Sequence, residues 1–167
     1  PIWCSNNLTT ALLTQSILYR QLTGSHRYEE METALRDWLL GCNPWGTSMI
    51  IELPLGGVYP QQPHSLWVKL MKNGNSTGGL VDGPVYKSIF NSLWGVSLNG
   101  GEDYAHFQPD KMVFHDCLHD YSTDEPTMDG TASLTFPLSH YAESGRKAAA
   151  MEQDNNVYSH GGIVRGD

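Results

Sequence analysis

The sequence predicts an all-α protein in which helical hairpins carry long irregular loops. Two observations lead to this fold class. Residues 8–39 contain two runs of apolar side chains at helical spacing, separated by a polar turn at Gly24. A further helical run spans residues 127–143, whereas the residues between the two regions are rich in Gly and Pro and form irregular connections.

The helical hairpin is the clearest element of the pattern. The first helix is expected over residues 8–23, after polar cap candidates at residues 5–7, and Gly24 ends it. Its apolar residues cover a wide surface, as in a helix that packs on more than one side. The second helix is expected to start at Ser25 and to stop at Gly41, with Pro44 soon after. Its apolar face comprises Tyr28, Met31, Leu35, Trp38 and Leu39.

The segments after the hairpin are shorter and less regular. Residues 42–65 form a long connection, and Trp45, Ile50 and Tyr59 favour an ordered, functional loop over a disordered one. We expect a short apolar segment at residues 66–72, a turn-rich loop at 73–84, a short helical or irregular piece at 86–94 and a polar loop at 98–110. The turn-rich loop lacks the residue order of a phosphate-binding motif.

Length and charge restrict the possible partners. At 167 residues the chain fits one domain with a core of its own. It has 18 acidic and 10 basic residues and a net charge of -8, which argues against nucleic acid or an anionic membrane surface as a partner. No apolar run has the length needed to cross a bilayer. Because the chain begins at Pro1, we expect a processed product or a cut piece.

Cysteine and aromatic residues add two further expectations. Cys4, Cys42 and Cys117 are widely spaced and lack a CxxC pair, so buried thiols are expected in place of disulfides or a zinc ribbon. Five Trp and eight Tyr are more than a core of this size requires. Sugar rings bind by stacking their C–H faces on such side chains, although core packing is an equally good explanation for any single one.

Residues 114–131 hold the densest cluster of ionisable side chains. Asp116, Asp120, Asp124 and Glu125 fall within ten residues, and two histidines lie among them. Their neighbours are apolar enough to indicate partly dry surroundings. Carboxylates crowded there repel one another, so at least one should have a raised pKa. A carboxyl group that is protonated near neutral pH is what a general acid needs.

The same segment resembles a known family. It follows the spacing aromatic-x-Asp-x4-aromatic-x3-Glu-x-small with Phe114, Asp116, Tyr121, Glu125 and Thr127. This pattern is similar to the second active-site signature of glycoside hydrolase family 9, the endoglucanase-like family. The resemblance implies that Glu125 is the proton donor and that Asp116 lines the active site. Tyr121 and the neighbouring Asp120 and Asp124 are expected to bind the substrate.

Two departures from the family pattern concern the substrate. Where the family usually has Asn and a small residue, this chain has Thr131 and Ala132. The family's first signature is matched more weakly, by a Gly-x-Asn-Pro turn that starts at Gly41 and by a later Pro-His pair. The resemblance implies that His64 of this pair contacts the sugar. Leu66 stands where the family has Arg, which suggests a subsite different from that of a plain cellulase.

The resemblance also implies the architecture and the activity. Residues 1–145 would be the C-terminal part of a catalytic domain, with helical hairpins that form part of an (α/α)6 toroid and long loops that line its cleft. The enzyme would hydrolyse β-linked glucan-type polysaccharide with inversion, without a cofactor, although calcium is possible. Its general base would lie in a missing N-terminal half, so this chain alone should be inactive and should pair with that half or self-associate. Secretion or a periplasmic location is implied as well, and residues 146–167 would be a linker or tail towards a further module.

Three alternatives remain open at this stage. His115 and His119 have a spacing at which two imidazoles on one helix face could bind a divalent metal, although no HExxH order is present. A Ser-His-Asp hydrolase is less supported, because no Gly-x-Ser-x-Gly elbow exists. A non-catalytic glycan-binding or scaffold module of the same fold is the third. The sugar itself could also be an amino sugar or a mixed-linkage glucan.

Overall fold

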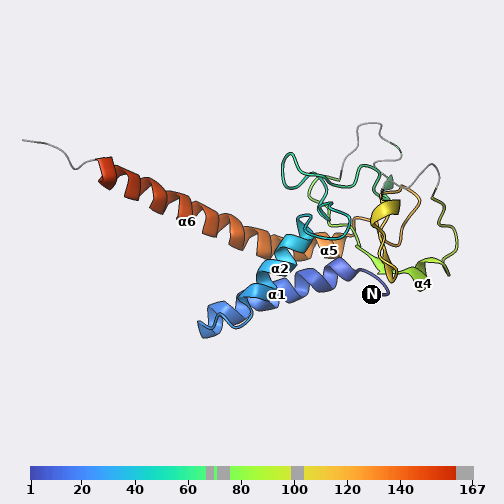
Figure 1. Ribbon diagram of the computed structural model, residues 1–167, viewed down its shortest axis with the longest axis horizontal. Helices are drawn as coiled ribbons and strands as arrows, with labels where there is room; N and C mark the ends of the chain where they lie inside the picture. Colours follow the sequence, from blue (N-terminus) through green and yellow to red (C-terminus); the bar gives the residue numbers. More distant parts are fainter. Residues whose placement is uncertain (67–69, 71–75, 99–103, 161–167) are drawn as a thin grey trace, which may run out of the picture.

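The computed structural model describes residues 1–66, 70, 76–98 and 104–160. Along the chain the elements are α1 (Ser5–Thr23), α2 (Glu29–Leu39), β1 (Val85–Tyr86), α4 (Lys87–Phe90), the 3-10 helix η1 (Ala105–Phe107), β2 (Met112–Val113), α5 (Met128–Ser133) and α6 (Thr135–His160). Helices α1, α2 and α5 lie together, the loops form a body beside them, and α6 extends away from both (Figure 1). The predicted helix-rich class is therefore confirmed. The short antiparallel pair β1–β2, with Val85 opposite Val113, was not predicted.

The predicted hairpin is present as α1 and α2. Helix α1 begins after Cys4, whose backbone is left-handed with φ 46°, and ends at Gly24 with φ 68°. The Gly24 N–H closes the last turn by donating to the Arg20 carbonyl at 2.9 Å. Helix α2 begins at Glu29, later than the expected Ser25, because residues 25–28 form the connecting turn. Side-chain oxygens of Thr23 and Ser25 accept backbone N–H groups within that turn.

A partly buried ion pair links three helices. Arg20 of α1 donates to Glu32 of α2 at 2.7 Å, and the Tyr141 hydroxyl of α6 donates to the same carboxylate at 3.1 Å. Burial alone would raise the pKa of Glu32, but the hydrogen bond and charge of Arg20 outweigh it and lower that pKa. The ionised carboxylate thus holds the hairpin against the start of α6.

The irregular connection after α2 is ordered by its own side chains. The Asn43 amide donates to the carbonyls of Trp38 and Thr47, and Ser48 accepts the Ile50 N–H. Isolated bridges then pair residue 50 with residue 80 and residue 81 with residue 126. These loops and the helices share one core, which includes Leu13, Ile17, Leu39, Trp45, Met49, Ile50, Ile51, Leu80, Val81, Tyr104, Phe114 and Leu134. The long loop is therefore packed, as expected from its aromatic residues.

The prediction of a single helix over residues 127–143 is wrong in one respect, because the chain forms two helices, α5 and α6, divided at Leu134. Pro137 explains the division. A continuous helix would need the residue 137 N–H to donate to the Ser133 carbonyl, and proline has no such N–H. Starting a new helix at Thr135 places Pro137 in the first turn, where N–H groups have no helical partner.

Helix α6 also continues beyond the expected end. Residues 146–160 are helical, although their polar composition favoured an irregular linker. The run Ala148–Ala149–Ala150 has high helix propensity, and Lys147 pairs with Glu143 one turn away at 2.7 Å. Side chains of residues 142–153 are exposed, so this part projects from the body. A domain boundary near residue 145 stays a prediction.

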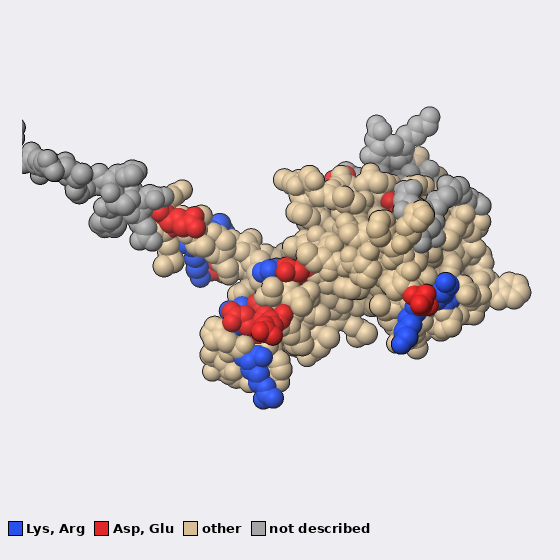
Figure 2. Space-filling model, in the orientation of Figure 1, with Lys and Arg blue, Asp and Glu red and all other residues tan. Residues whose placement is uncertain are grey.

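Several expected segments lie outside the described residues. These are most of residues 66–72 and parts of the loops at 73–84 and 98–110. Among the helices that the structure describes, none combines the length and apolar character needed to cross a membrane. On the face shown in Figure 2, charged side chains gather over the helices, whereas the loop-rich body shows only a small mixed group near α4 and a few acidic atoms in its upper part.

Candidate active site

The acidic segment is anchored by one buried aromatic ring. Phe114 follows β2 and is fully buried, with its ring centroid 5.7 Å from that of Trp45 and 5.9 Å from that of Tyr104. Gln108 fixes the backbone there, because its amide donates to the Phe114 carbonyl at 2.6 Å and its oxygen accepts the Phe114 N–H at 3.2 Å. The segment that follows therefore leaves the core from a fixed point.

Asp120 organises the turn at the centre of the segment. Its carboxylate is fully buried and is hydrogen-bonded to His115 Nδ1 at 2.7 Å, to the Ser122 hydroxyl at 2.5 Å and to the Thr123 hydroxyl at 2.7 Å. Burial alone would raise the pKa of Asp120, but these hydrogen bonds outweigh it and lower that pKa. In this arrangement Asp120 stabilises the loop and has no surface that a substrate could touch.

Asp116 connects the acidic segment to the loop that carries His64. Its two carboxylate oxygens accept the backbone N–H groups of Gln61 at 2.7 Å and Gln62 at 2.6 Å. The His64 N–H then donates to the Asp124 carbonyl at 2.9 Å. His64 Nδ1 lies 2.6 Å from the Leu118 carbonyl, which can only accept, so Nδ1 carries a proton. The structure thus brings together His64, Asp116 and Asp124, which the sequence placed at one site.

Asp124 is the carboxyl group with the most perturbed surroundings in the segment. It is fully buried, and its Oδ2 accepts the Cys117 N–H at 3.0 Å. Burial and then the negative charge of Asp116 raise the pKa of Asp124 well above its usual range. The raised pKa expected of one acid in this cluster therefore falls on Asp124.

Glu125 lies next to this buried group but differs from it. Its side chain is partly exposed, and it makes no hydrogen bond or ion pair with the residues that the structure describes. Its backbone is held, because the Glu125 carbonyl accepts the Asp82 N–H at 3.0 Å. A fixed backbone with an unengaged carboxyl group suits a residue that must meet a ligand.

Asp82 is a further acid at this site, and the sequence pattern did not single it out. It is 4% exposed and lies between the start of α1 and the segment that ends at Thr127. Burial raises the pKa of Asp82 to about 6, the charge of Glu125 adds to the rise, and hydrogen bonds from Cys4 and Thr127 oppose it. The residue after Asp82 must be glycine for the chain to pass this close to α1, because a Cβ at Gly83 would lie 2.5 Å from the Asn6 side chain.

Aromatic rings line the segment next to His64. Trp3 stacks on Tyr121 with centroids 6.3 Å apart, and His64 meets the same Tyr121 ring edge-on at 6.2 Å. The Tyr121 hydroxyl is fixed by donating to the Trp94 carbonyl at 3.0 Å. Trp3 is 45% exposed, so its ring remains accessible. Trp3 was not predicted as a site residue, although the surplus of Trp and Tyr was a signal for such a surface.

Comparison with known proteins identifies the family. The model of the family described as Glycosyl hydrolase family 9 matches residues 1–138. The chain belongs to this family. It is 32% identical over 126 residues to Endoglucanase 21 of Arabidopsis thaliana, a match that covers 74% of this chain and 18% of that protein. The chain thus spans under a fifth of that relative's length. No solved structure matches this chain.

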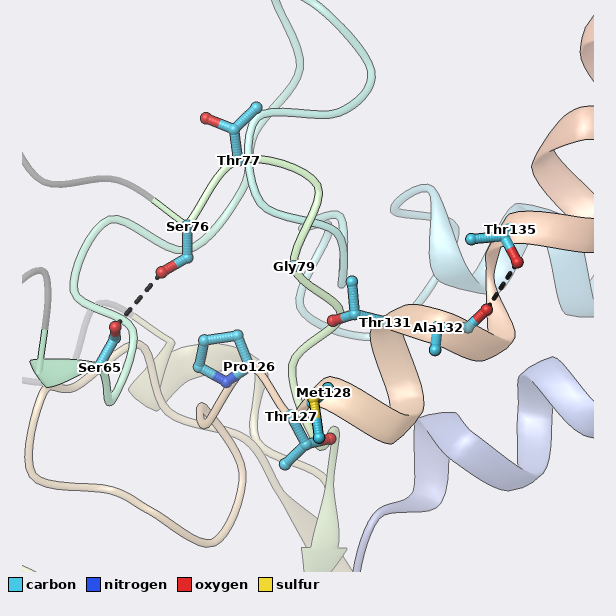
Figure 3. Close-up of a pocket in the computed structure, with 10 residues that line it drawn as sticks. All are labelled: Ser65, Ser76, Thr77, Gly79, Pro126, Thr127, Met128, Thr131, Ala132 and Thr135. Carbon is cyan, nitrogen blue, oxygen red and sulfur yellow. Dashed lines mark hydrogen bonds between the residues drawn. The ribbon is translucent and has the colours of Figure 1, made fainter.

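Two hollows adjoin the acidic segment. His64 lines a cavity of about 190 Å³ together with Ser65, Leu66, Leu118 and His119. The second hollow, of about 510 Å³, lies between residues 76–79 and α5. Figure 3 shows hydroxyl-bearing side chains on several of its sides. Its lining is Ser65, Ser76, Thr77, Gly79, Pro126, Thr127, Met128, Thr131, Ala132 and Thr135. Thr131 and Ala132, where the family pattern usually differs, therefore lie on a hollow that Pro126, the residue after Glu125, also lines.

The two histidines of the metal alternative have different surroundings. His115 is buried, pairs with Asp120 and packs against the Phe90 ring at a centroid distance of 4.4 Å. His119 is exposed and lies on the His64 cavity. In the part of the chain that the structure describes, no group of three or more His, Cys, Asp or Glu side chains is placed to hold a metal ion.

Proposed function

We propose that this chain supplies the general acid, Glu125, of an inverting glycoside hydrolase that cuts β-linked glucan-type polysaccharides or oligosaccharides. One observation carries the proposal: among the four clustered acids, Glu125 is the available one. Asp120 and Asp124 are fully buried, and Asp116 is occupied by two backbone N–H groups. A general acid must come within hydrogen-bond distance of the atom it protonates.

The proposed chemistry needs a second carboxylate. In inverting hydrolysis the acid protonates the departing oxygen while a base, roughly 6.5–9.5 Å away, activates water on the other face of the sugar. We assign the acid to Glu125 and expect the base from an N-terminal part of the catalytic domain. Asp116 then positions the His64 loop beside the acid. On this proposal the chain has no hydrolytic activity by itself, and the mechanism uses no cofactor.

The aromatic surface supports a sugar as the ligand. Trp3 and Tyr121 present stacked rings next to His64, and C–H faces of sugars pack well on such rings. The name of the Arabidopsis relative, an endoglucanase, is consistent with a polysaccharide substrate. The same name supports our proposal of a secreted or periplasmic protein. Leu66, in place of the family's Arg, lines the His64 cavity and supports a subsite preference of its own.

The architecture we propose is part of an (α/α)6 toroid. The hairpin α1–α2 would be one of its helical pairs. Leucines remain exposed along α1, including Leu8 at 65% and Leu22 at 84%. Apolar surface of this kind is normally covered by neighbouring elements. We expect the isolated chain to bind an apolar dye and to self-associate, and co-expression with the N-terminal half to suppress both. A monodisperse monomer without dye binding would contradict this.

The test of the proposed function uses the intact protein. Glu125→Gln keeps the shape of the side chain but removes the proton donor, so kcat on soluble β-glucan oligosaccharides should fall about 10²–10⁴-fold with binding largely kept. Glu143→Gln on the exposed part of α6 is the matched control and should leave kcat unchanged. Unchanged hydrolysis by Glu125→Gln would remove the assignment. Binding without hydrolysis by the wild-type protein would favour a glycan-binding scaffold.

A further inference from the structure

Residues 61–64, at the end of the loop that carries His64, are hydrogen-bonded to the acidic segment. Gln61 and Gln62 donate their backbone N–H groups to Asp116, and the His64 N–H donates to the Asp124 carbonyl. His64 Nδ1 donates to the Leu118 carbonyl. The position of the His64 ring therefore depends on where Asp116 and Asp124 lie relative to each other.

The two carboxyl groups are neighbours with unequal surroundings. The Cys117 N–H, directly after Asp116, donates to Asp124 Oδ2, while Asp124 Oδ1 is buried without a hydrogen-bond partner in the described part of the chain. The negative charge of Asp116 also acts on Asp124. Two ionised carboxylates cannot hydrogen-bond to each other, because each of them only accepts.

The proton of such a pair belongs on Asp124. Asp116 is half-buried and receives two short backbone N–H bonds, which stabilise its ionised form. Asp124 is fully buried and receives one. Burying an unpaired charge is costly, whereas a protonated carboxyl can satisfy its second oxygen by donating to the ionised neighbour.

We propose that Asp124 is a positioning residue that stays protonated in the folded protein and, by donating a hydrogen bond to Asp116, holds the loop that presents His64. That this loop serves a glycosidase cleft rests on the proposed function, whereas the protonated pair itself does not. Because His64 lines the cavity of about 190 Å³, the Asp116–Asp124 pair would fix its ring at that cavity.

The pair makes stability depend on pH in one direction. The titratable groups around Asp124 are Asp116, Asp120 with its partner His115, and His64 on the facing loop. Because the pKa of Asp124 is higher in the folded than in the unfolded protein, its contribution is fully present below about pH 4 and is lost as pH rises through the folded pKa. A neutral side chain of the same shape should abolish this loss.

The Asp124→Asn variant provides such a side chain, because its amide oxygen can accept the Cys117 N–H and its amide nitrogen can donate to Asp116. In thermal unfolding of the intact protein, we expect wild type and Asp124→Asn to agree near pH 4 and the variant to become the more stable one as pH rises to about 8. The infrared band of a protonated carboxyl at neutral pH should be present in the wild type and missing in Asp124→Asn. A variant that is less stable by the same amount at every pH, or no such band in the wild type, would overturn the protonated pair.

Kinetics test the positioning role separately. Asp124→Ala removes the hydrogen-bond donor and should raise KM more than Asp124→Asn, which keeps one. Asp116→Asn replaces an accepting carboxylate oxygen with an N–H donor, so the loop should shift and KM should rise about tenfold. A misplacement of one ångström can cost roughly 100-fold, so this rise is within the expected range. An unchanged KM in Asp116→Asn would show that the Asp116–Asp124 pair does not position His64. If the wild-type protein proves inactive on all sugars, the stability and infrared results still decide the protonated pair.

Discussion

Replacing Asp82 with Asn should stabilise the protein at neutral pH but not in acid. Asp82 is 4% exposed, and burial is the main reason that its pKa rises from 3.8 to about 6. The folded state therefore holds the proton more tightly than the unfolded chain. The stability contribution of Asp82 is fully present below about pH 4 and is lost as pH rises through about 6.

The size of the effect follows from this interval. The pKa of Asp82 rises from 3.8 to about 6, and each pH unit corresponds to about 1.4 kcal/mol. Ionisation of Asp82 therefore lowers the free energy of unfolding at pH 7 by about 3 kcal/mol. Asp82→Asn removes the charge, and its amide oxygen can still accept the Thr127 hydroxyl bond. We therefore expect a gain of roughly 1–3 kcal/mol at pH 7 and close to none near pH 4.

Urea unfolding of the intact protein across this pH range is the assay. Asp110→Asn, at an exposed acid near β2, is the control and should change the free energy of unfolding by under about 0.5 kcal/mol at every pH. A constant loss of stability in Asp82→Asn across the whole range would show that the carboxylate is ionised and well paired in the folded protein. That result would refute the reasoning from burial.

Three further variants test the packing and the sugar surface. Phe114→Ala should lower the free energy of unfolding by about 3–5 kcal/mol in urea titration, because it leaves a cavity in the core; a loss under about 1 kcal/mol would contradict the anchoring role. Glu32→Gln should cost about 2 kcal/mol at pH 7, since it leaves partly buried Arg20 unpaired, and the cost should shrink as pH falls through the lowered pKa of Glu32; a cost independent of pH would argue against the ion pair. Trp3→Ala should raise KM for oligosaccharides roughly fivefold, about 1 kcal/mol, with little change in kcat, and an unchanged KM would exclude Trp3 from the sugar surface.

The helical elements were predictable because their signals are local. Apolar spacing and Gly24 define the α1–α2 hairpin, and both act within a few residues. The division at Leu134 was also readable, since Pro137 cannot continue a helix from Ser133, but the apolar pattern on both sides concealed it. The extension of α6 depends on helix propensity and a Glu143–Lys147 pair, which the polar composition outweighed in the prediction.

The roles of the individual acids could not be predicted, because they depend on partners distant in the chain. Asp116 and Asp124 are close together in the sequence, but the Asp116 partners are 54 and 55 residues away. Only the folded chain shows which acid is buried and which is available. Asp82 was missed for the same reason, since its perturbed pKa arises from burial beneath segments on either side of it.

Leaving-group dependence in Glu125→Gln provides the decisive measurement. A general acid matters only where the departing oxygen needs a proton, so the intact variant should lose about 10²–10⁴-fold in kcat on β-glucan oligosaccharides. On a dinitrophenyl β-glycoside, whose leaving group departs without protonation, its kcat should stay within a few-fold of the wild-type value. An equal loss on both substrates, or no loss on either, would contradict the assignment of Glu125 as the acid.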